Sequence, residues 1–591
     1  MFRRRVRILL AAVLIGGAAL VLRLAQVQVG WHERFDRDDY VRAAGSHLVE
    51  TVRGGIYTRW GTPLALETPS FELGVHYAKL ADDDWQGTVA ALCGVSVQEL
   101  REQAQATIAR VERMEEYVRR RRGRSDIRVA ERYQYHCVAR DVPAEVAALV
   151  RTEPGRFPTV RVGRRDVPAV KVLERTARHY LNGGLAPHVV GELLRLSPET
   201  WEVLAEQGRT WVMGEPFSAI GRRYKMDDRI GASGVEKAAE DLLRGERGYV
   251  LNRLVFGVLS VEKASSATPP KAGHDVYLTL REDFQRAANA ALERAAREET
   301  LDFKSGSLVI VDVRDGAVLA AATYPSYDLA SYRDDYEHLK ADPRWPFMFR
   351  PIQAALPTGS VYKVITAIAA LEEGAITPST TRTCARREVF YAGRSAKTFH
   401  CTGSHGTISL LTAIEKSCNI YFYHTGLAAG GEALARWGRA FGLGRRTGVD
   451  LPYENEGQLP VPRHTYGVLN LSIGQGDLLC TPLQVACAMA AIANGGRLCR
   501  PHFLHHARNA AGEVVMEVEP EFAQVPVSGA TLSTVREGMR RAVESGTARL
   551  AGLDPFRAAG KTGSAELGSG QPNHAWFAGY APHDAPKIAF A

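Results

Sequence analysis

The sequence contains no internal repeat and no low-complexity segment, and only 8 of its 591 residues are cysteine. The first two absences argue against a repeat array and against a long disordered linker. The chain is longer than a single hydrophobic core usually serves, so we expect at least two folded domains. Composition is otherwise that of a globular protein with a net charge of +8.

The densest positive charge is an arginine run within residues 119–124. Such a run can form a nucleic-acid patch, but this one follows Glu112, Glu115 and Glu116 in a helix-like stretch. We favour a solvated helix face of mixed charge, in contact with anionic lipid or a partner. No nucleic-acid partner is predicted.

The N-terminus places arginines at positions 3, 4, 5 and 7 before an apolar run over residues 8–22. At about 1.5 Å per residue this run spans about 22 Å, short of a roughly 30 Å hydrocarbon core, so it must continue to about residue 29. We predict a cytoplasmic tail over residues 1–5 and an uncleaved transmembrane anchor over 6–29. A cleaved signal peptide is the alternative, although no small-x-small cleavage site follows Leu22. The arginines favour a single-pass protein of the inner (cytoplasmic) membrane, with the rest of the chain in the periplasm or another extracytoplasmic space.

Local patterns predict the main elements between residues 50 and 330. In chain order they are a strand with a glycine kink over 52–57, a turn over 230–234, a helix over 235–243, a strand over 276–280, a helix over 282–299, and a strand–turn–strand hairpin over 307–312 and 317–323. The hairpin begins a sheet-based domain.

Three short motifs follow one another in the second half of the chain: Ser360-Val-Tyr-Lys363, Ser417-Cys-Asn419 and Lys561-Thr-Gly563. Apolar residues at helical spacing place Ser360 at the start of a buried helix, where negative charge is favoured. A serine nucleophile needs a base beside it, and a lysine one helical turn later supplies one. Each motif alone is weak evidence, because such residues are common on solvated helix faces, caps and turns. Their order is that of penicillin-binding proteins and class A β-lactamases.

With these motifs, the chain resembles the class B penicillin-binding proteins, which are monofunctional peptidoglycan D,D-transpeptidases, over nearly its whole length. Further segments carry the resemblance: Arg53-Gly-Gly-Ile56, Gly61-Thr-Pro-Leu-Ala65, Gly231-Ala-Ser-Gly-Val-Glu236, Leu243-Arg-Gly245, Ser472-Ile-Gly-Gln-Gly476, Thr481-Pro-Leu-Gln484 and His574–Pro582. Two departures do not touch the chemistry: Thr58-Arg59-Trp60 stands for Asp-Arg-Asn, and Thr358 for a proline. No room remains for a glycosyltransferase module.

The resemblance implies an α+β architecture with two parts after the anchor. A non-catalytic pedestal of the dimerisation type would span residues 40–285. A transpeptidase domain of serine β-lactamase type would span 300–591, with an antiparallel sheet flanked by helices and the Ser360 helix at its centre. The family continues beyond the strand in which this chain stops, so we expect a C-terminally incomplete domain.

The resemblance also implies roles for the motif residues. Ser360 would attack the penultimate carbonyl of a stem peptide that ends in D-Ala-D-Ala, with Lys363 as base and Ser417 as proton relay. Asn419 would hold the substrate backbone. Four residues would bind substrate: Lys561 and Thr562 at the terminal carboxylate, Gly563 through close approach, and Ser564, whose N–H would join that of Ser360 at the oxyanion. No separate hydrolytic glutamate is recognisable, which predicts slow deacylation and inhibition by β-lactams.

Four metal-ligand residue types lie between and within the first two motifs: Cys384, Cys401, His405 and Cys418. Such a set can form a closed structural zinc site. Elongation-type relatives resembling penicillin-binding protein 2 can hold zinc here, with cysteines in this chain replacing aspartates at two positions. A Cys384–Cys401 disulfide and free thiols are the alternatives. No organic cofactor is predicted, and the other cysteines are expected to be buried thiols.

These observations predict a membrane-anchored transpeptidase of cell-wall elongation, paired with a polytopic peptidoglycan glycosyltransferase and other elongation proteins. Three alternatives remain open: a division-type transpeptidase, a D,D-carboxypeptidase or β-lactam sensor with the same motifs, and a catalytically silent scaffold that activates the glycosyltransferase. The zinc-like cluster favours elongation over division.

Overall fold

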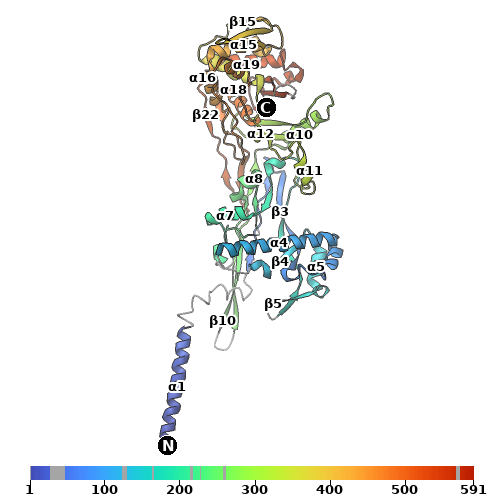
Figure 1. Cartoon of the computed structure of the whole chain (residues 1–591), viewed down its shortest axis with the longest axis vertical. Coiled ribbons are helices and arrows are strands. Elements are labelled where there is room, and N and C mark those ends of the chain that lie inside the picture. The colour runs from blue at the N-terminus through green and yellow to red at the C-terminus, as the bar shows by residue number, and fades with distance from the viewer. Residues whose placement is uncertain are drawn as a thin grey trace.

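The computed structural model describes residues 2–26, 47–122, 129–162, 165–212, 217–226, 228–256, 261–566 and 573–591. The molecule is elongated, with helix α1 at one end, a mixed α/β region in the middle and the domain that contains the C-terminus at the other end (Figure 1). The two predicted folded parts are therefore stacked along the long axis.

Helix α1 spans Phe2–Ala25 and lies at one end of the molecule (Figure 1). Within the described ranges, no helix combines the length and the apolarity needed to cross a membrane. Residues 27–29 of the predicted anchor lie outside the described residues.

The middle region is built on two sheets. Strands β1, β10 and β11 form a three-stranded antiparallel sheet. A seven-stranded sheet has the order β21-β20-β12-β2-β3-β4, with β7 also paired to β3. The strand bounds are β1 His47–Val49, β2 Ile56–Tyr57, β3 Pro63–His76, β4 Tyr135–Ala139, β7 Val170–His179, β10 Gly248–Phe256, β11 Val261–Thr268, β12 Asp275–Leu278, β20 Leu504–Arg508 and β21 Val514–Glu517. Because β20 and β21 come from the second half of the chain, this sheet joins the two parts of the molecule.

Helices and hairpins surround the long strands β3 and β7. The remaining elements of this region are α3 Gln86–Cys93, α4 Val97–Arg122, α5 Ala144–Thr152, β5 Thr159–Val162, β6 Arg165–Pro168, α6 Pro187–Val190, β8 Leu193–Arg195, α7 Pro198–Glu206, β9 Arg229–Gly231, α8 Gly234–Ala238 and α9 Glu240–Leu243. A separate hydrophobic core gathers Trp85, Val89 and Leu100 against Val75 and Val172. The pedestal thus has its own core.

Of the strand predicted over residues 52–57, only β2 forms. The glycines before β2 instead allow the backbone to pack closely against a neighbouring segment. A Cβ on Gly54 would lie 1.9 Å from the carbonyl oxygen of His274. The N–H of Gly54 donates to the carbonyl of Leu243 at 2.9 Å instead of joining a ladder. The glycines therefore dock the chain against a neighbouring segment.

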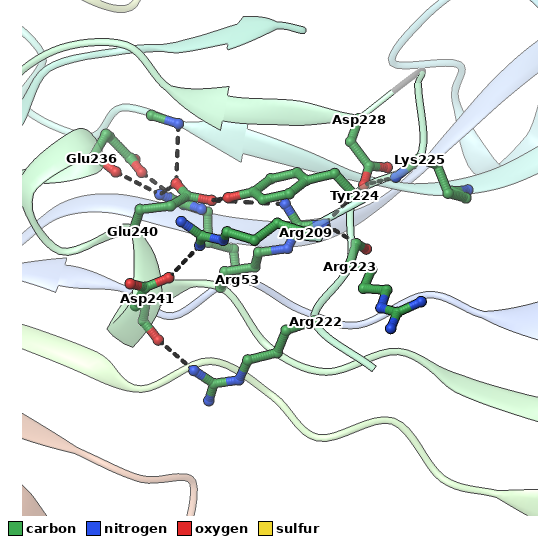
Figure 2. Close-up of polar contacts among 12 residues, drawn as sticks. Arg53, Arg209, Arg222, Arg223, Tyr224, Lys225, Asp228, Glu236, Glu240 and Asp241 are labelled. Atoms are coloured by element: carbon green, nitrogen blue, oxygen red, sulfur yellow. Dashed lines mark hydrogen bonds and ion pairs between the residues drawn. The ribbon is translucent and has the colours of Figure 1, made fainter. Parts of the chain in front are cut away.

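The helix predicted over 235–243 is in fact two short helices, α8 and α9, with a break at Ala239. The two carboxylates Glu236 and Glu240 flank this break, and both bind Arg53, at 2.7 Å and 2.8 Å. Figure 2 shows Arg53 beside both carboxylates. The break accompanies this arrangement, in which Glu240 also accepts hydrogen bonds from the N–H of Gly231 and the hydroxyl of Tyr224.

The Arg53 cluster is buried, and both of its arginines are ion-paired, although Nη2 of Arg178 has no hydrogen-bond partner among the described residues. Arg178 binds the second oxygen of Glu236 at 2.7 Å. Burial disfavours charge on Arg53, but Glu236 and Glu240 outweigh it and raise the pKa of Arg53 above its ordinary value. The network joins β7, α8, α9 and the segment before β2, and so holds the upper pedestal together.

The second domain contains a five-stranded antiparallel sheet in the order β14-β13-β25-β24-β23. Its strands are β13 Gly306–Asp312, β14 Val318–Tyr324, β23 Ala559–Ala565, β24 His574–Ala581 and β25 Ile588–Phe590. The predicted hairpin is thus confirmed as β13–β14, and the last strand lies in the middle of the sheet.

Helices cover both faces of this sheet, as the family resemblance implies. On one face, Ala288 of α10 packs against Ala320 and Ala322 of β14. On the other face, Val309 and Val311 join the main core with the wholly buried helix α18. The helices of the domain are α10 Glu282–Arg297, α11 Tyr336–Ala341, α12 Arg350–Gln353, α13 Lys363–Glu372, α14 Leu410–Glu415, α15 Asn419–Ala429, α16 Gly431–Ala440, α17 Thr465–Ser472, α18 Pro482–Ala493 and α19 Gly529–Glu544.

Short strands complete the domain. They are β15 Thr381–Cys384, β16 Arg387–Ala392, β17 Ser395–His400, β18 Gly406–Ser409, β19 Arg497–Cys499 and β22 Phe522–Gln524. Strands β16 and β17 form a hairpin, and β15 pairs with β18. These two small sheets carry the cysteine cluster next to helix α15.

Candidate active site

Ser360 lies in a 3₁₀ turn, η6 (Gly359–Tyr362), which runs directly into helix α13. The α-helix itself begins at Lys363, three residues later than the predicted start, because Gly359 has a φ of +54° and turns the chain sharply. A Cβ on Gly359 would lie 2.4 Å from the carbonyl oxygen of Ser564. The turn is therefore pressed against strand β23, which brings the first and third motifs together.

Lys363 is fully buried at the start of α13. Its Nζ donates to the carbonyl of Ser417 at 2.7 Å and to Oδ1 of Asn419 at 2.6 Å, and it lies 3.1 Å from Oγ of Ser417. Burial lowers the pKa of Lys363 to about 7. A large fraction of this amine is thus neutral near neutral pH, which a general base requires.

Lys561, on β23, is also fully buried, and its Nζ donates to Oγ of Ser417 at 2.9 Å and to the carbonyl of Thr562 at 2.9 Å. Burial lowers the pKa of Lys561, and the positive charge of Lys363 lowers it further. Both lysines meet at the single hydroxyl of Ser417, so charge on one disfavours charge on the other.

The proton count at Ser417 favours one arrangement. A hydroxyl has one proton and can accept from two donors. If Lys363 is neutral, its lone pair can accept the Ser417 proton, while charged Lys561 donates to the same oxygen. The three side chains then form a connected path along which a proton can move.

Ser417 lies in the link between α14 and α15, directly before the N-cap residue of α15. Ser417 has a φ of +55°, which non-glycine residues rarely adopt. Asn419 opens α15, and its Nδ2 donates to the carbonyl of His400 at 3.0 Å. With Oδ1 on Lys363, the amide therefore bridges the lysine and the β16–β17 hairpin.

Strand β23 lies at the edge of the five-stranded sheet, paired to β24 on one side. Thr562 Oγ1 lies 2.8 Å from Oγ1 of Thr547, and Ser564 is exposed. A Cβ on Gly563 would lie 2.7 Å from the carbonyl of Thr358, so only glycine fits between β23 and the serine turn. The predicted substrate-binding residues all lie on this edge strand.

The four predicted metal ligands come together beside the second motif. One ligand atom from each of Cys384, Cys401, His405 and Cys418 lies within 4.8 Å of all the others. Cys401 Sγ is 3.9 Å from Cys418 Sγ and 3.6 Å from Nδ1 of His405. Around a tetrahedral zinc, two sulfurs at about 2.3 Å lie about 3.8 Å apart, and a sulfur and an imidazole nitrogen about 3.6 Å apart. The observed separations fit such an ion.

All eight cysteines are free in the structure, so the Cys384–Cys401 disulfide is not formed. The Cys401 and Cys418 sulfurs are hydrogen-bonded to each other, which lowers the pKa of Cys401 and raises that of Cys418. The N–H of Asn419 also donates to Sγ of Cys401, at 3.2 Å. The cluster is thereby connected directly to a motif residue.

Sequence reasoning assigned no role to three residues that support the site. Gly474 packs on the serine turn, since a Cβ there would lie 2.0 Å from the carbonyl of Gly359. Trp576 Nε1 donates to the carbonyl of Pro357 at 2.9 Å. Both belong to segments that carried the family resemblance, which was the available signal. Thr547, which contacts Thr562, lies in no recognised motif.

The fold and this site define the class of the protein. The penicillin-binding protein transpeptidase domain matches residues 306–591, and the penicillin-binding protein dimerisation domain matches residues 49–278. The chain belongs to the class B penicillin-binding proteins, with a dimerisation-type pedestal and a transpeptidase domain.

Within this class, the chain is similar to two kinds of curated transpeptidase. Peptidoglycan D,D-transpeptidase PbpA of Mycolicibacterium smegmatis is 30% identical over 374 residues, which cover 61% of this chain and 74% of that protein. Peptidoglycan D,D-transpeptidase MrdA of Acinetobacter baumannii is 27% identical over 624 residues, which cover 100% of this chain and 84% of the relative.

A solved structure shows the same architecture. It describes the structural coordination of polymerization and crosslinking by a peptidoglycan synthase complex, and one of its chains is 27% identical to this one with a TM-score of 0.66. The likeness covers 99% of this chain and 94% of the other.

Proposed function

We propose that this protein is a peptidoglycan D,D-transpeptidase of cell-wall elongation that works through an acyl-serine at Ser360. The observation that carries the proposal is the pair of buried lysines, Lys363 and Lys561, that converge on the Ser417 hydroxyl beside the serine turn. The similarity to MrdA and PbpA transpeptidases supports the reaction.

Acylation begins with the attack of Ser360 Oγ on the penultimate carbonyl of a stem peptide, while neutral Lys363 takes the hydroxyl proton. The tetrahedral intermediate collapses, the peptide bond to the last D-alanine breaks, and its nitrogen receives a proton through Ser417. An amine of a second stem peptide then attacks the ester. Its proton returns to Ser360 through the same residues, and a new peptide bond links the two strands.

Strand β23 positions the donor peptide. An extended peptide can add to its outer edge, and Gly563 permits the close approach. Lys561 and Thr562 hold the terminal carboxylate through charge-assisted hydrogen bonds. The backbone N–H groups of Ser360 and Ser564 stabilise the oxyanion, worth about 3 kcal/mol per donor in comparable sites. Asn419 holds the peptide backbone.

A structural zinc ion at Cys384, Cys401, His405 and Cys418 is part of the proposal. Four protein ligands leave no open position, so zinc would act as a structural crosslink. These residues lie at the end of β15, in the segment between β17 and β18 and at the N-cap of α15, and Cys401 contacts the Asn419 N–H. Bound metal can be measured on the purified protein. We expect one zinc per chain, lost in Cys418→Ser, and a metal-free wild type would contradict the site.

The cellular setting follows from the arginine-flanked N-terminus and from the relatives. We propose a single-pass anchor over residues 6–29, which extends beyond the end of α1, with the pedestal and transpeptidase domain on the extracytoplasmic side. The similar chain in a complex that combines polymerization and crosslinking supports a partner with glycosyltransferase activity. The pedestal would be the part of this chain nearest to that partner.

The proposal is tested with a fluorescent penicillin and the full-length chain. Wild type should form a stable covalent adduct, and Ser360→Ala should form none while keeping its melting temperature. Stem peptide alone should then release little D-alanine, whereas added acceptor amine should give crosslinked product. Rapid release of D-alanine without an acceptor amine would identify a carboxypeptidase. A wild type that fluorescent penicillin does not label would favour a catalytically silent scaffold.

A further inference from the structure

The pedestal contains a cavity of about 230 Å³ that no step of the proposed reaction uses. Residues of β3, β4, β8, β9 and α4 contribute to its lining. Seven lysine or arginine side chains and five carboxylates lie along it. The cavity therefore has an excess of positive charge, and its two sides differ in how that charge is balanced.

On one side, each cation has a carboxylate partner. Arg247 binds Asp228 at 2.5 Å and Glu50 at 2.6 Å, Arg244 binds Asp228 at 2.8 Å, and Lys225 binds Glu50 at 2.7 Å. Figure 2 shows Lys225 and Asp228 at the edge of the Arg53 cluster. On this side every one of the three cations contacts a carboxylate, although the two carboxylates do not cancel all three charges.

On the other side, Arg195 of β8 and Arg229 of β9 are direct partners in the antiparallel register. Like charges directly opposite each other on paired strands are destabilising. Within the described ranges, neither guanidinium makes an ion pair or a hydrogen bond. Arg110 of α4 lies on the same side and donates to Nδ1 of His136 at 3.3 Å. We call Arg110, Arg195 and Arg229 the arginine wall.

The carboxylates near the arginine wall do not balance it. Glu72 lines the cavity but lies 3.9 Å from Arg140, which adds a fourth arginine to this region. Glu131 is the other carboxylate on this side. Four guanidinium groups and two carboxylates leave a local excess of two positive charges.

This arrangement is costly without a counter-ion. Desolvation, and next the positive charge of Arg140, lowers the pKa of both Arg195 and Arg229. Arg195 is exposed, while Arg110 and Arg229 are half-buried, so a solute can reach them from solvent. A doubly negative oxyanion would remove the imbalance.

The size and chemistry of the cavity limit the ligand. Pockets for drug-sized molecules enclose roughly 300–1,000 Å³, so about 230 Å³ suits a small group. The planar fork of arginine binds phosphate oxygens in a bidentate manner. We propose that the arginine wall binds a phosphate or diphosphate group, either free in solution or on a lipid headgroup.

Binding is tested on the full-length protein by calorimetric titration with sodium diphosphate at constant ionic strength. Wild type should bind one diphosphate per chain with saturation. Arg195→Gln and Arg229→Gln should each weaken the affinity at least tenfold. The matched control is Arg151→Gln, an exposed pedestal arginine outside the cavity that pairs with Glu174 at 2.6 Å, and it should bind as wild type does.

Two further readouts make the test decisive. Penicillin labelling should be unchanged in the arginine variants, which reports a folded protein and separates this proposal from the proposed reaction. Without diphosphate, Arg229→Gln should melt at or above the wild-type temperature, because a repulsion is removed. The proposal would be overturned if wild type showed no saturable binding at millimolar diphosphate, or if both wall variants bound diphosphate with the wild-type affinity.

The source of the phosphate is resolved by embedding wild type in nanodiscs. If the natural ligand is a lipid headgroup, discs with phosphatidic acid, whose phosphate monoester can carry two negative charges, should weaken the binding of added diphosphate relative to discs with phosphatidylglycerol, whose phosphate diester carries one. If it is a free anion, the affinity for diphosphate should be equal in the two kinds of anionic disc. Either result supports a phosphate site and identifies its source.

Discussion

Two groups of buried cationic side chains, the Arg53 cluster and the lysines of the active site, differ in whether carboxylates pair with them. In the pedestal, Arg53 and Arg178 both bind Glu236, and Arg53 also binds Glu240. In the transpeptidase domain, Lys363 and Lys561 are fully buried and, among the described residues, have no carboxylate partner. The first cluster has a raised arginine pKa, and the second has lowered lysine pKa values. The ion-paired arginines stabilise the pedestal, whereas the buried lysines without a carboxylate partner serve the proposed proton transfer.

The largest effect should come from removing the unpaired base. Lys363→Met keeps the length of the side chain and removes its basic nitrogen. We expect the rate of acylation by fluorescent penicillin to fall about 10⁴-fold, because Ser360 loses its proton acceptor. The free energy of unfolding should change by only about 1 kcal/mol, since loss of hydrogen bonds and relief of desolvation oppose each other. Acylation within threefold of wild type would show that Lys363 is not the base.

Breaking the ion pairs of the Arg53 cluster should instead lower the stability strongly and leave the labelling rate nearly unchanged. Glu236→Gln leaves Arg53 and Arg178 buried with one carboxylate fewer, so the pedestal should lose about 3–5 kcal/mol of stability. Calorimetry of the full chain should show an earlier unfolding transition. Labelling at low temperature should stay near the wild-type rate, because Glu236 is not part of the catalytic site. A large loss of labelling with no thermal shift would reverse the assignment of the two clusters.

The same substitution on an exposed pair should have the smallest effect. Glu174 pairs with Arg151 at 2.6 Å on the pedestal surface. Glu174→Gln should change stability by no more than about 0.5 kcal/mol, because solvent screens such pairs. Thermal melts of both glutamine variants side by side provide the check. Equal destabilisation by the two would mean that burial does not set the strength of these pairs.

The site could be predicted from the sequence because most of its residues occur in short motifs. Ser360 and Lys363 lie one turn apart, so their proximity follows from local structure. The contact of Lys561 with the hydroxyl of Ser417, 144 residues away, was not predicted, since the family resemblance placed Lys561 only at the terminal carboxylate of the substrate. The β13–β14 hairpin and helix α10 were predictable from local periodicity for the same reason.

Features that depend on distant contacts were missed or misread. The pairing of β12 with β20 joins the pedestal to the second domain, and no local pattern indicates it. The break between α8 and α9 accompanies the contact of Glu236 and Glu240 with Arg53, which is 183 and 187 residues away. The arginine wall likewise arises from strand register, since Arg195 and Arg229 become neighbours only when β8 pairs with β9.

The central claim, that unpaired burial makes Lys363 a base, is tested most directly by the pH dependence of acylation. The pKa of Lys363 is lowered to about 7, so the neutral, reactive amine is the minority form below that pH and the majority form above it. The rate of penicillin labelling should therefore rise about tenfold per pH unit up to about pH 7 and then level off. A rate that is flat from pH 5 to 8, or that rises only above pH 9, would contradict this account.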